Sequence, residues 1–398
     1  MTVGGPDRSD DMLQKPRIAF IKSGGFSHSN QHVLRQLQRQ NPDAAIDLIE
    51  TGGLRLSIFN ALPVMAALAI AHYGQKAGRS VSALRKHGIR TPAYFNAIGA
   101  ALARKLAGRP YLFTFQTQSL IDGSQPGIPH FVYTDHTHLT NLYYPGVTRK
   151  DLASPAWIEK ERSIYANARV TFTMASHVAR SLHEHYGIDE SRIQCVRAGA
   201  NAEASDFSAL DERRYASKNI LFVGIDWERK GGPQLLRAFE KVLIRHPDAT
   251  LAIVGSSPPV STPGCQVIGK VPLEAVAEHY RRASIFCMPT RNEPQGMVFM
   301  EAFEHRLPIV ATTIGAIPDL IQDGVSGYLV DPDAVDALAR RLDELLSDPE
   351  KCRAMGHAGF EHVKTHYTWE RTGQLIGERI RRELALDGTN ARSRRPPR

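Results

Sequence analysis

The chain has 398 residues, of which 42% are hydrophobic and 23% are charged, and its formal net charge is +8 at pH 7. This composition is typical of a globular protein and excludes a disordered or fibrous chain. Because single hydrophobic cores stop growing at about 250–300 residues, the length predicts two domains.

The first half of the chain alternates short apolar strands with helical patterns. Strands are expected at 17–21, 44–50, 110–116, 130–134, 169–174 and 192–197, and helices at 29–40, 57–74, 80–107, 156–166 and 176–186. Glycine, proline and polar clusters separate these segments, as is usual at the ends of strands and helices.

After a polar stretch at 201–218 the same alternation begins again. Strands are expected at 219–223, 250–254, 284–288, 308–311 and 327–330, and helices at 233–246, 272–283, 296–305, 317–322, 333–346 and 370–385. Alternating strands and helices predict parallel sheets joined by crossover helices. The expected fold class is therefore α/β, with two Rossmann-like domains whose parallel sheets face a central cleft.

The pattern divides the chain into five regions. We expect a disordered N-terminus at 1–15, a first Rossmann-like domain at 16–205, a second at 206–370, a terminal helix at 371–386 and a disordered tail at 387–398. In open α/β sheets ligands bind at the carboxyl ends of the strands, so the loops that follow the strands are the candidate site.

The net positive charge lies in the first half of the chain. Between Glu50 and Asp122 there are nine basic residues and no acidic one. This asymmetry predicts an acidic partner, which is an anionic membrane surface, a phosphate-bearing acceptor or a nucleic acid. A solvated basic face without a ligand is the alternative.

Two carboxylates surround the loop after the strand at 284–288. Glu293 lies just before the expected helix, and Glu301 lies about one turn inside it. A helix N-terminus binds anions, and a carboxylate can accept hydrogen bonds from two vicinal hydroxyls. The amides expected to point into the cleft are those of Gly296, Met297 and Val298. This arrangement suits a ligand that carries both phosphates and hydroxyls.

This segment resembles the Glu-x7-Glu motif of retaining glycosyltransferases with the GT-B fold, in particular family 4. The similarity continues through 307–311, 315–319 and 323–330. The resemblance implies that Glu293 contacts the donor sugar, that Glu301 contacts the ribose and that the three amides meet the sugar or diphosphate. It also implies that the first domain binds the acceptor, the second binds the nucleotide sugar and the terminal helix crosses back to the first. Gln295 departs from the family, which more often has an aromatic residue there.

A glycine-rich, basic loop follows the strand at 219–223 and favours phosphate binding. It resembles the family's Gly-Arg…Lys-Gly element, whose two cations hold the donor diphosphate. Lys230 matches the lysine, whereas Ile225 stands at the arginine position. Arg229 is the candidate for a compensating cation.

Two further loops are candidates in the first domain. Gly24 and Gly25 resemble the family's N-terminal glycine loop, which lies over the donor phosphates and the acceptor. Asp135, His136 and His138 follow the strand at 130–134, where the family often has a His or Asp near the reacting end of the sugar. His136 is the better match, and His138 and Asp135 are alternatives. A metal site at the two histidines has no further ligands in the sequence.

Weaker candidates lie in the loops that border the nucleobase in the family. They include Gly255 and Val271. The alternative is that both residues belong to the scaffold.

The resemblance to this family implies a hexosyltransferase-like, retaining glycosyltransferase that needs no metal. Its donor is a nucleoside-diphosphate sugar, with UDP, GDP and ADP as alternatives, and no other cofactor is expected. A GT-B epimerase or phosphorylase, and an inactive nucleotide-sugar-binding module, stay open as alternatives. Ile225 is the feature that keeps the inactive module open.

The expected acceptor is a glycan or a lipid-linked, anionic group. Nucleic acid is excluded as a partner because Glu293 and Glu301 would repel a polyanion. The polar N-terminus is not a signal peptide, and the longest apolar run, 59–71, is too short to span a bilayer. The expected location is the cytoplasm, with peripheral contact at the inner face of an anionic membrane.

Overall fold

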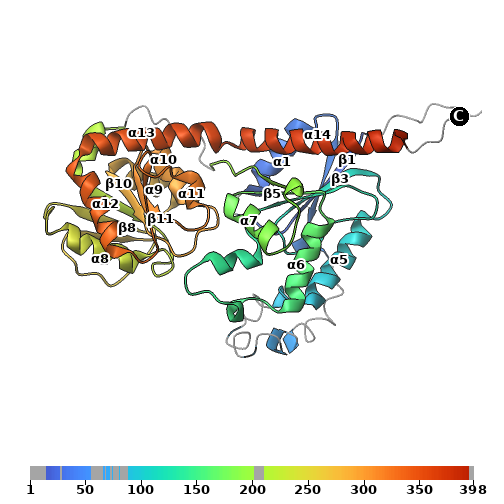
Figure 1. Cartoon of the computed structure of the whole chain (residues 1–398), viewed down its shortest axis with the longest axis horizontal. Helices are drawn as coiled ribbons and strands as arrows, with labels where there is room; N and C mark the ends of the chain where they lie inside the picture. The colour runs from blue at the N-terminus through green and yellow to red at the C-terminus, as the bar shows by residue number, and fades with distance from the viewer. Residues whose placement is uncertain are drawn as a thin grey trace, which may run out of the picture.

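The computed structural model shows two α/β domains that lie side by side, with a long terminal helix over the first (Figure 1). It describes residues 15–26, 29–54, 66–67, 69–71, 74, 80, 88–200 and 210–393.

The first domain contains a six-stranded parallel sheet in the order β2-β1-β3-β4-β5-β6. Its strands are β1 (Arg17–Lys22), β2 (Ala45–Glu50), β3 (Tyr111–Thr117), β4 (His130–Thr134), β5 (Val170–Thr173) and β6 (Ile193–Cys195). Its helices are α1 (Ser29–Gln40), α5 (Pro92–Leu106), α6 (Pro155–Asn167) and α7 (Ser176–Glu184), with short 3-10 turns that include η4 (His138–Tyr143).

The second domain contains another six-stranded parallel sheet, in the order β12-β11-β10-β7-β8-β9. Its strands are β7 (Asn219–Val223), β8 (Thr250–Val254), β9 (Cys265–Gly269), β10 (Ile285–Met288), β11 (Ile309–Thr312) and β12 (Gly327–Val330). Its helices are α8 (Gly232–Val242), α9 (Leu273–Arg282), α10 (Met297–Glu304), α11 (Ile317–Leu320), α12 (Val335–Ser347) and α13 (Pro349–His366).

Each sheet reverses its strand order once, and the reversal positions the site. In the second sheet the chain adds β8 and β9 on one side of β7 and then returns to pair β10 on its other side. In the first sheet the same reversal occurs between β1 and β3. Ligands of open α/β sheets bind at such reversals, outside the carboxyl ends of the strands. The loops after β7 and β10 are therefore neighbours.

The terminal helix α14 (Trp369–Ser393) packs on the first domain, although it follows the second in sequence. Trp369, Ile376 and Ile380 belong to the buried core of the first domain. Gly373 and Gly377 lie four residues apart on the face that meets α1, where a Cβ at either would stand 2.6 Å from a glutamine side chain. Small residues on this face allow the two helices to approach closely.

Several helices differ from the sequence prediction. Of the helix predicted at 80–107, residues 81–87 lie outside the described residues. α5 begins at Pro92 because Thr91 Oγ1 accepts a hydrogen bond from Tyr94 N at 3.3 Å and so caps the helix. α14 continues to Ser393, so residues 387–393 are helical instead of disordered, since extending an existing helix costs little. The sequence pattern also missed β9 and α13.

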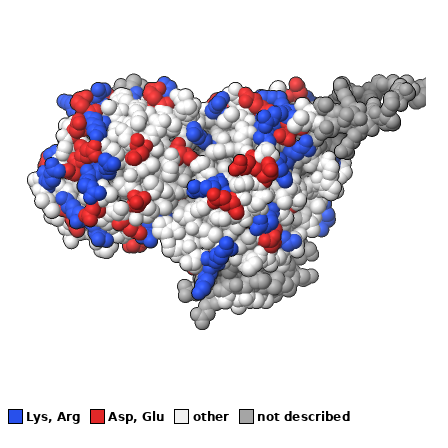
Figure 2. All heavy atoms as spheres, in the orientation of Figure 1, with Lys and Arg blue, Asp and Glu red and all other residues white. Residues whose placement is uncertain are grey.

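Two predictions fall largely outside the described residues. They are the helix at 57–74 and the disordered N-terminus at 1–15. Much of the segment between Glu50 and Asp122, which has basic but no acidic residues, also lies outside the described residues. On the face shown in Figure 2, basic and acidic side chains are interspersed over both domains.

Candidate functional site

Two loops of the second domain touch at the carboxyl ends of β7 and β10. Gly231 has a φ of +76°, and a Cβ on it would lie 1.9 Å from the carbonyl oxygen of Pro289. Arg291 N donates to Arg229 O at 2.9 Å, which joins the two loops through their main chains. Glycine is required at 231 by both its backbone angle and this close approach. The contact brings Lys230 to the loop that carries Glu293.

Lys230 and Glu293 form a buried ion pair. Lys230 Nζ bonds to Glu293 Oε2, and the two side chains are only 13% and 8% exposed. Glu293 Oε1 accepts a hydrogen bond from Gly296 N at 3.1 Å, at the start of α10. The positive end of the helix dipole favours a carboxylate at this position. The structure thus joins two predicted site residues that are 63 positions apart in the sequence.

The N-terminus of α10 is partly used by the protein itself. The amide of Gly296, predicted to face a ligand, donates to Glu293 instead. Met297 and Val298 are the first two residues of α10, so their amides have no acceptor within the helix. Gly296 has a φ of +80°, which favours glycine at this cap. The amides of Met297 and Val298 therefore remain the candidates for an anion.

Glu301 lies on α10 and is hydrogen-bonded to Tyr280, whose hydroxyl donates to Oε2 at 3.1 Å. Burial raises the pKa of Glu301, and the bond from Tyr280 opposes this in part. Burial and the neighbouring Glu301 also raise the pKa of Glu304 to about 7. The two predicted donor-binding glutamates therefore differ: Glu293 has a cationic partner, and Glu301 has a neutral one.

A cavity of about 470 Å³ opens beside the loops after β7, β8 and β9. Its lining residues are Ile225, Trp227, Gly255, Ser256, Ser257, Pro258 and Lys270. Gly255 has a φ of +93°, and a Cβ there would lie 2.9 Å from Gly224 O. Among the described residues, Ser256 Oγ is buried and has no hydrogen-bond partner. Val271 packs against the core of the second domain instead of lining this cavity.

The arginine that the family would have at 225 has no direct substitute here. Ile225 is 76% exposed at the cavity. Arg229 bonds to Asp226 at 3.2 Å and donates to Asn292 O at 3.0 Å, so it is engaged with its own loop and the neighbouring one. Lys230 pairs instead with Glu293, the carboxylate at the start of α10, and is the better candidate for a cation at the ligand site.

The glycine loop of the first domain follows β1. Gly24 has a φ of +60°, and its amide donates to Glu50 Oε1 at 3.0 Å. Asn30 Nδ2 donates to Gly24 O at 2.8 Å, which fixes the loop against α1. A Cβ placed on Gly25 would have no described atom within 4 Å. Within the described ranges nothing fills the space beside Gly25, as an approaching ligand requires.

The two histidines after β4 have different environments. His138 Nε2 accepts a hydrogen bond from Ala153 N at 2.6 Å, and its ring packs edge-on against Trp157. His136 Nδ1 lies 2.7 Å from the hydroxyl of Thr140. Burial lowers the pKa of each histidine to about 3. Both imidazoles are therefore neutral at pH 7. His138 has a structural role, because it binds the main chain at Ala153.

Asp135 precedes these histidines and is half-buried. Burial raises its pKa to about 6.

A buried carboxylate that the sequence prediction missed supports this loop. Glu161 is 1% exposed and accepts hydrogen bonds from His138 N at 2.9 Å, Ser119 Oγ at 3.2 Å and Tyr165 at 3.2 Å, and also from Tyr186. Burial raises its pKa to about 7, although these donors oppose the rise. Glu161 thus fixes the main chain beside His136.

We expect Glu161→Gln to change how stability depends on pH. Because its folded pKa lies above the ordinary value of 4.5, protonated Glu161 stabilises the folded chain below that value. The contribution is lost as pH rises to about 7, at up to about 1.4 kcal/mol per pH unit. Urea unfolding between about pH 5 and about pH 8 should show a shallower decline for Glu161→Gln. The matched control is Glu159→Gln, an exposed change on α6; equal slopes in all three proteins would contradict the expectation.

Direct contacts join the two domains near the site. Ser176 N and Oγ, at the start of α7, each donate to Asp319 at 2.6 Å. Gln295, where the family more often has an aromatic residue, donates to Met174 Sδ at 2.8 Å. Asp319 thus caps a helix of the opposite domain, and the loop of Glu293 contacts the first domain.

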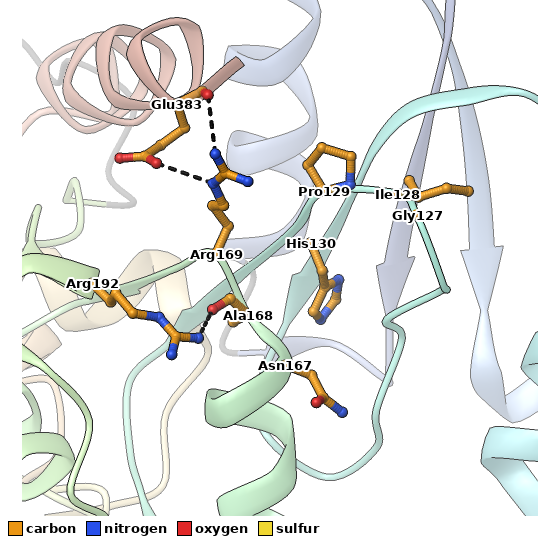
Figure 3. A pocket seen from close by; sticks show the side chains of 9 residues that line it. All are labelled: Gly127, Ile128, Pro129, His130, Asn167, Ala168, Arg169, Arg192 and Glu383. Carbon is orange, nitrogen blue, oxygen red and sulfur yellow. Dashed lines mark hydrogen bonds and ion pairs between the residues drawn. The ribbon is translucent and has the colours of Figure 1, made fainter. Parts of the chain in front are cut away.

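A second cavity of about 470 Å³ lies at the opposite edge of the first sheet, beside the amino ends of β4 and β5 (Figure 3). Arg169 donates to Glu383 of α14 at 3.2 Å, and Arg192 donates to the main-chain oxygen of Ala168. Arg169 therefore attaches α14 through Glu383, and Arg192 is held by the main chain. The cavity is separate from the predicted site, which lies at the carboxyl ends.

Two classes of feature are absent from the part of the chain that the structure describes. None of its helices combines the length and hydrophobicity needed to cross a bilayer. Within the same described ranges, no group of three or more His, Cys, Asp or Glu side chains could hold a metal ion.

Comparison with known proteins identifies the second domain. Residues 217–348 match the family described as "Glycosyl transferases group 1", and this segment contains Lys230, Glu293 and Glu301. It is a glycosyl transferases group 1 domain. The group 1 domain spans β7 to β12, so it contains the whole reversal at which the two loops meet.

Two curated relatives are similar to part of the chain. D-inositol 3-phosphate glycosyltransferase of Corynebacterium glutamicum is 31% identical over 243 residues, which is 54% of this chain and 58% of the relative. GDP-mannose-dependent alpha-(1-6)-phosphatidylinositol monomannoside mannosyltransferase of Mycolicibacterium smegmatis is 33% identical over 170 residues, or 38% of this chain and 44% of the relative. The chain spans about half the length of the curated relatives it matches.

A solved structure extends the similarity to the whole fold. Sucrose-phosphate synthase from Thermosynechococcus elongatus superposes with a TM-score of 0.63 over 93% of this chain and 100% of that chain, at 17% identity. With two six-stranded parallel sheets, the chain has the GT-B fold, and this prediction from the sequence is confirmed.

Proposed function

We propose that this chain is a retaining glycosyltransferase that moves a hexosyl group from a nucleoside-diphosphate sugar to an acceptor hydroxyl without a metal ion. The observation that carries the proposal is the buried Lys230–Glu293 pair of the group 1 domain. It lies where open α/β sheets bind their ligands. The matching relatives are named for glycosyl transfer, and one is named for GDP-mannose.

In the proposed reaction the bond between the anomeric carbon and the diphosphate oxygen breaks, and its electron pair leaves with the diphosphate. The acceptor oxygen bonds to the anomeric carbon, and its proton passes to the departing diphosphate. Lys230 and the amides of Met297 and Val298 stabilise the growing negative charge. Glu293 contacts the sugar, and Glu301 accepts hydrogen bonds from the ribose.

His136 orients the sugar in this proposal and is not a strong base. Its pKa, lowered to about 3 by burial, makes the imidazole a weak proton acceptor at neutral pH. The hydroxyl of Thr140 holds one ring nitrogen, which fixes the ring in the loop after β4. Proton transfer to the leaving diphosphate is consistent with such a neutral, fixed imidazole.

The proposed acceptor carries a phosphate and is a glycan or lipid-linked molecule bound by the first domain. The two relatives are named for an inositol phosphate and for a phosphatidylinositol glycolipid, which are both anionic. The excess of basic residues before Asp122 supports the same choice. A lipid-linked acceptor would place the chain at the surface of an anionic membrane on its cytoplasmic side.

The test is product analysis with UDP-, GDP- and ADP-sugars in the presence of EDTA, using inositol phosphate and phosphatidylinositol as acceptors. We expect transfer with the anomeric configuration of the donor retained, read from the NMR coupling of the anomeric proton. An inverted product would contradict retention, and activity restored only by a divalent ion would contradict metal independence. Donor binding without turnover would favour the inactive module that Ile225 keeps open.

A further inference from the structure

Tyr144 belongs to the first domain but is buried in the second. It directly follows η4 and is 3% exposed. Its ring is part of the apolar cluster that forms the core of the group 1 domain, and the neighbouring Val147 packs against the same cluster. The loop after η4 therefore docks one aromatic side chain across the boundary between the domains.

The hydroxyl of Tyr144 has no hydrogen-bond partner among the residues that the structure describes. A buried hydroxyl without a partner costs about 1–3 kcal/mol, so each such group needs an explanation. The ring itself is well packed, and a phenylalanine would make the same apolar contacts. The oxygen atom is the part of this side chain that packing does not explain.

This hydroxyl lies beside the loop of Glu293. A Cβ on Gly315 would stand 3.4 Å from Tyr144 Oη and 1.9 Å from the carbonyl oxygen of Glu293. Burial raises the pKa of Tyr144, and the carboxylates of Glu293 and Asp135 raise it further. The hydroxyl therefore keeps its proton and can donate it to an oxygen atom.

The ring of Tyr144 also lies parallel to that of His136, with the ring centres 6.3 Å apart and an angle of 8° between the planes. Tyr144 thus contacts the candidate that the first domain contributes and adjoins the candidate that the second contributes. A sugar held by both His136 and Glu293 would reach this buried hydroxyl from the boundary between the two domains.

We propose that Tyr144 binds the donor sugar: its hydroxyl donates a hydrogen bond to a sugar oxygen held beside Glu293. This inference rests on the proposed function and adds a residue to that site. It also gives the first domain a second contact with the donor, beside that of His136, so that sugar binding favours the docked arrangement of the two domains. The sugar oxygen replaces the missing partner of a buried group.

The test compares Tyr144→Phe with Tyr143→Phe by calorimetry. Tyr143 is a matched control because its hydroxyl donates to Glu184 at 2.8 Å, away from the predicted site residues. The ligands are UDP with UDP-glucose, GDP with GDP-mannose and ADP with ADP-glucose. We expect Tyr144→Phe to weaken the nucleotide sugar about three- to tenfold while the matching nucleoside diphosphate binds within about twofold of wild type. Tyr143→Phe should change neither affinity.

Thermal unfolding separates this role from a structural one. Since the hydroxyl has no partner among the described residues, Tyr144→Phe should unfold at or above the wild-type temperature. A clear loss of thermal stability, or equal weakening of diphosphate and nucleotide sugar, would overturn the inference. If wild type binds a nucleotide sugar and Tyr144→Phe binds it equally well, the inference fails and the proposed function stands. If wild type binds none of the six ligands, both fail.

Discussion

Glu293→Gln should lower the rate of sugar transfer by about 10²–10³-fold, which is the usual loss when one preorganised polar contact to the reacting group is removed. Glutamine keeps the shape of the side chain and can still accept from Gly296 N. It removes the charge that Lys230 pairs with, and it weakens the contact with a sugar hydroxyl. The rate of transfer under saturating donor is the quantity to measure.

The ion pair adds an expectation about stability. The sequence alone suggests little change in melting temperature when Glu293 is replaced. Because Lys230 and Glu293 are both largely buried, removing one partner leaves an unpaired buried charge, at a cost of about 3–5 kcal/mol. We therefore expect Glu293→Gln to melt below wild type and to regain stability with a nucleoside diphosphate, which supplies a new anion for Lys230.

Glu278→Gln is the matched control for this change. Glu278 lies on α9, is partly exposed and pairs with Arg281 and Arg282 on its own helix. It should transfer sugar at the wild-type rate. Unchanged transfer by Glu293→Gln, with donor saturation verified, would remove Glu293 from the reaction.

Lys230→Met should lower transfer by a similar factor of about 10²–10³, because Arg229, the neighbouring cation, is already engaged and does not stand ready to stabilise the leaving diphosphate. Arg229→Met, a change of the same kind one position earlier, should lower it by less than about threefold. The reason is that Arg229 already bonds to Asp226 and to the main chain at Asn292. Single-turnover rates for the two variants separate these expectations.

The relative transfer rates of Lys230→Met and Arg229→Met show which cation stabilises the diphosphate. If Arg229→Met loses as much activity as Lys230→Met, then Arg229 leaves its present partners and compensates for Ile225. If Lys230→Met retains most of the wild-type rate, the diphosphate is stabilised elsewhere.

The sequence predicted the loops around the site but not which of them touch. Lys230 and Glu293 each follow a strand, and local alternation of strand and helix is sufficient to show that. Their pairing depends on β10 lying beside β7, which is a choice of strand order made by the whole sheet. The resemblance to a known family supplied this order, and hydrophobic periodicity alone could not.

The two residues that the prediction missed differ in the signal they leave. Glu161 shares a buried face of α6 with Trp157 and Ile164, so a carboxylate on an apolar stripe marked it. Tyr144 leaves no such pattern, because its burial comes from the other domain. His136 and His138 also look alike in sequence, and only their partners, Thr140 and the amide of Ala153, separate them.

The most direct test of the donor site is calorimetric titration of wild type and Lys230→Met with UDP, GDP and ADP. We expect wild type to bind at least one of the three, and Lys230→Met to bind it about tenfold or more weakly, since a hydrogen bond to a charged group contributes about 1.5–3 kcal/mol. Wild type that binds none of the three at millimolar concentration, or a Lys230→Met variant that binds as tightly as wild type, would contradict a diphosphate site at Lys230 and the start of α10.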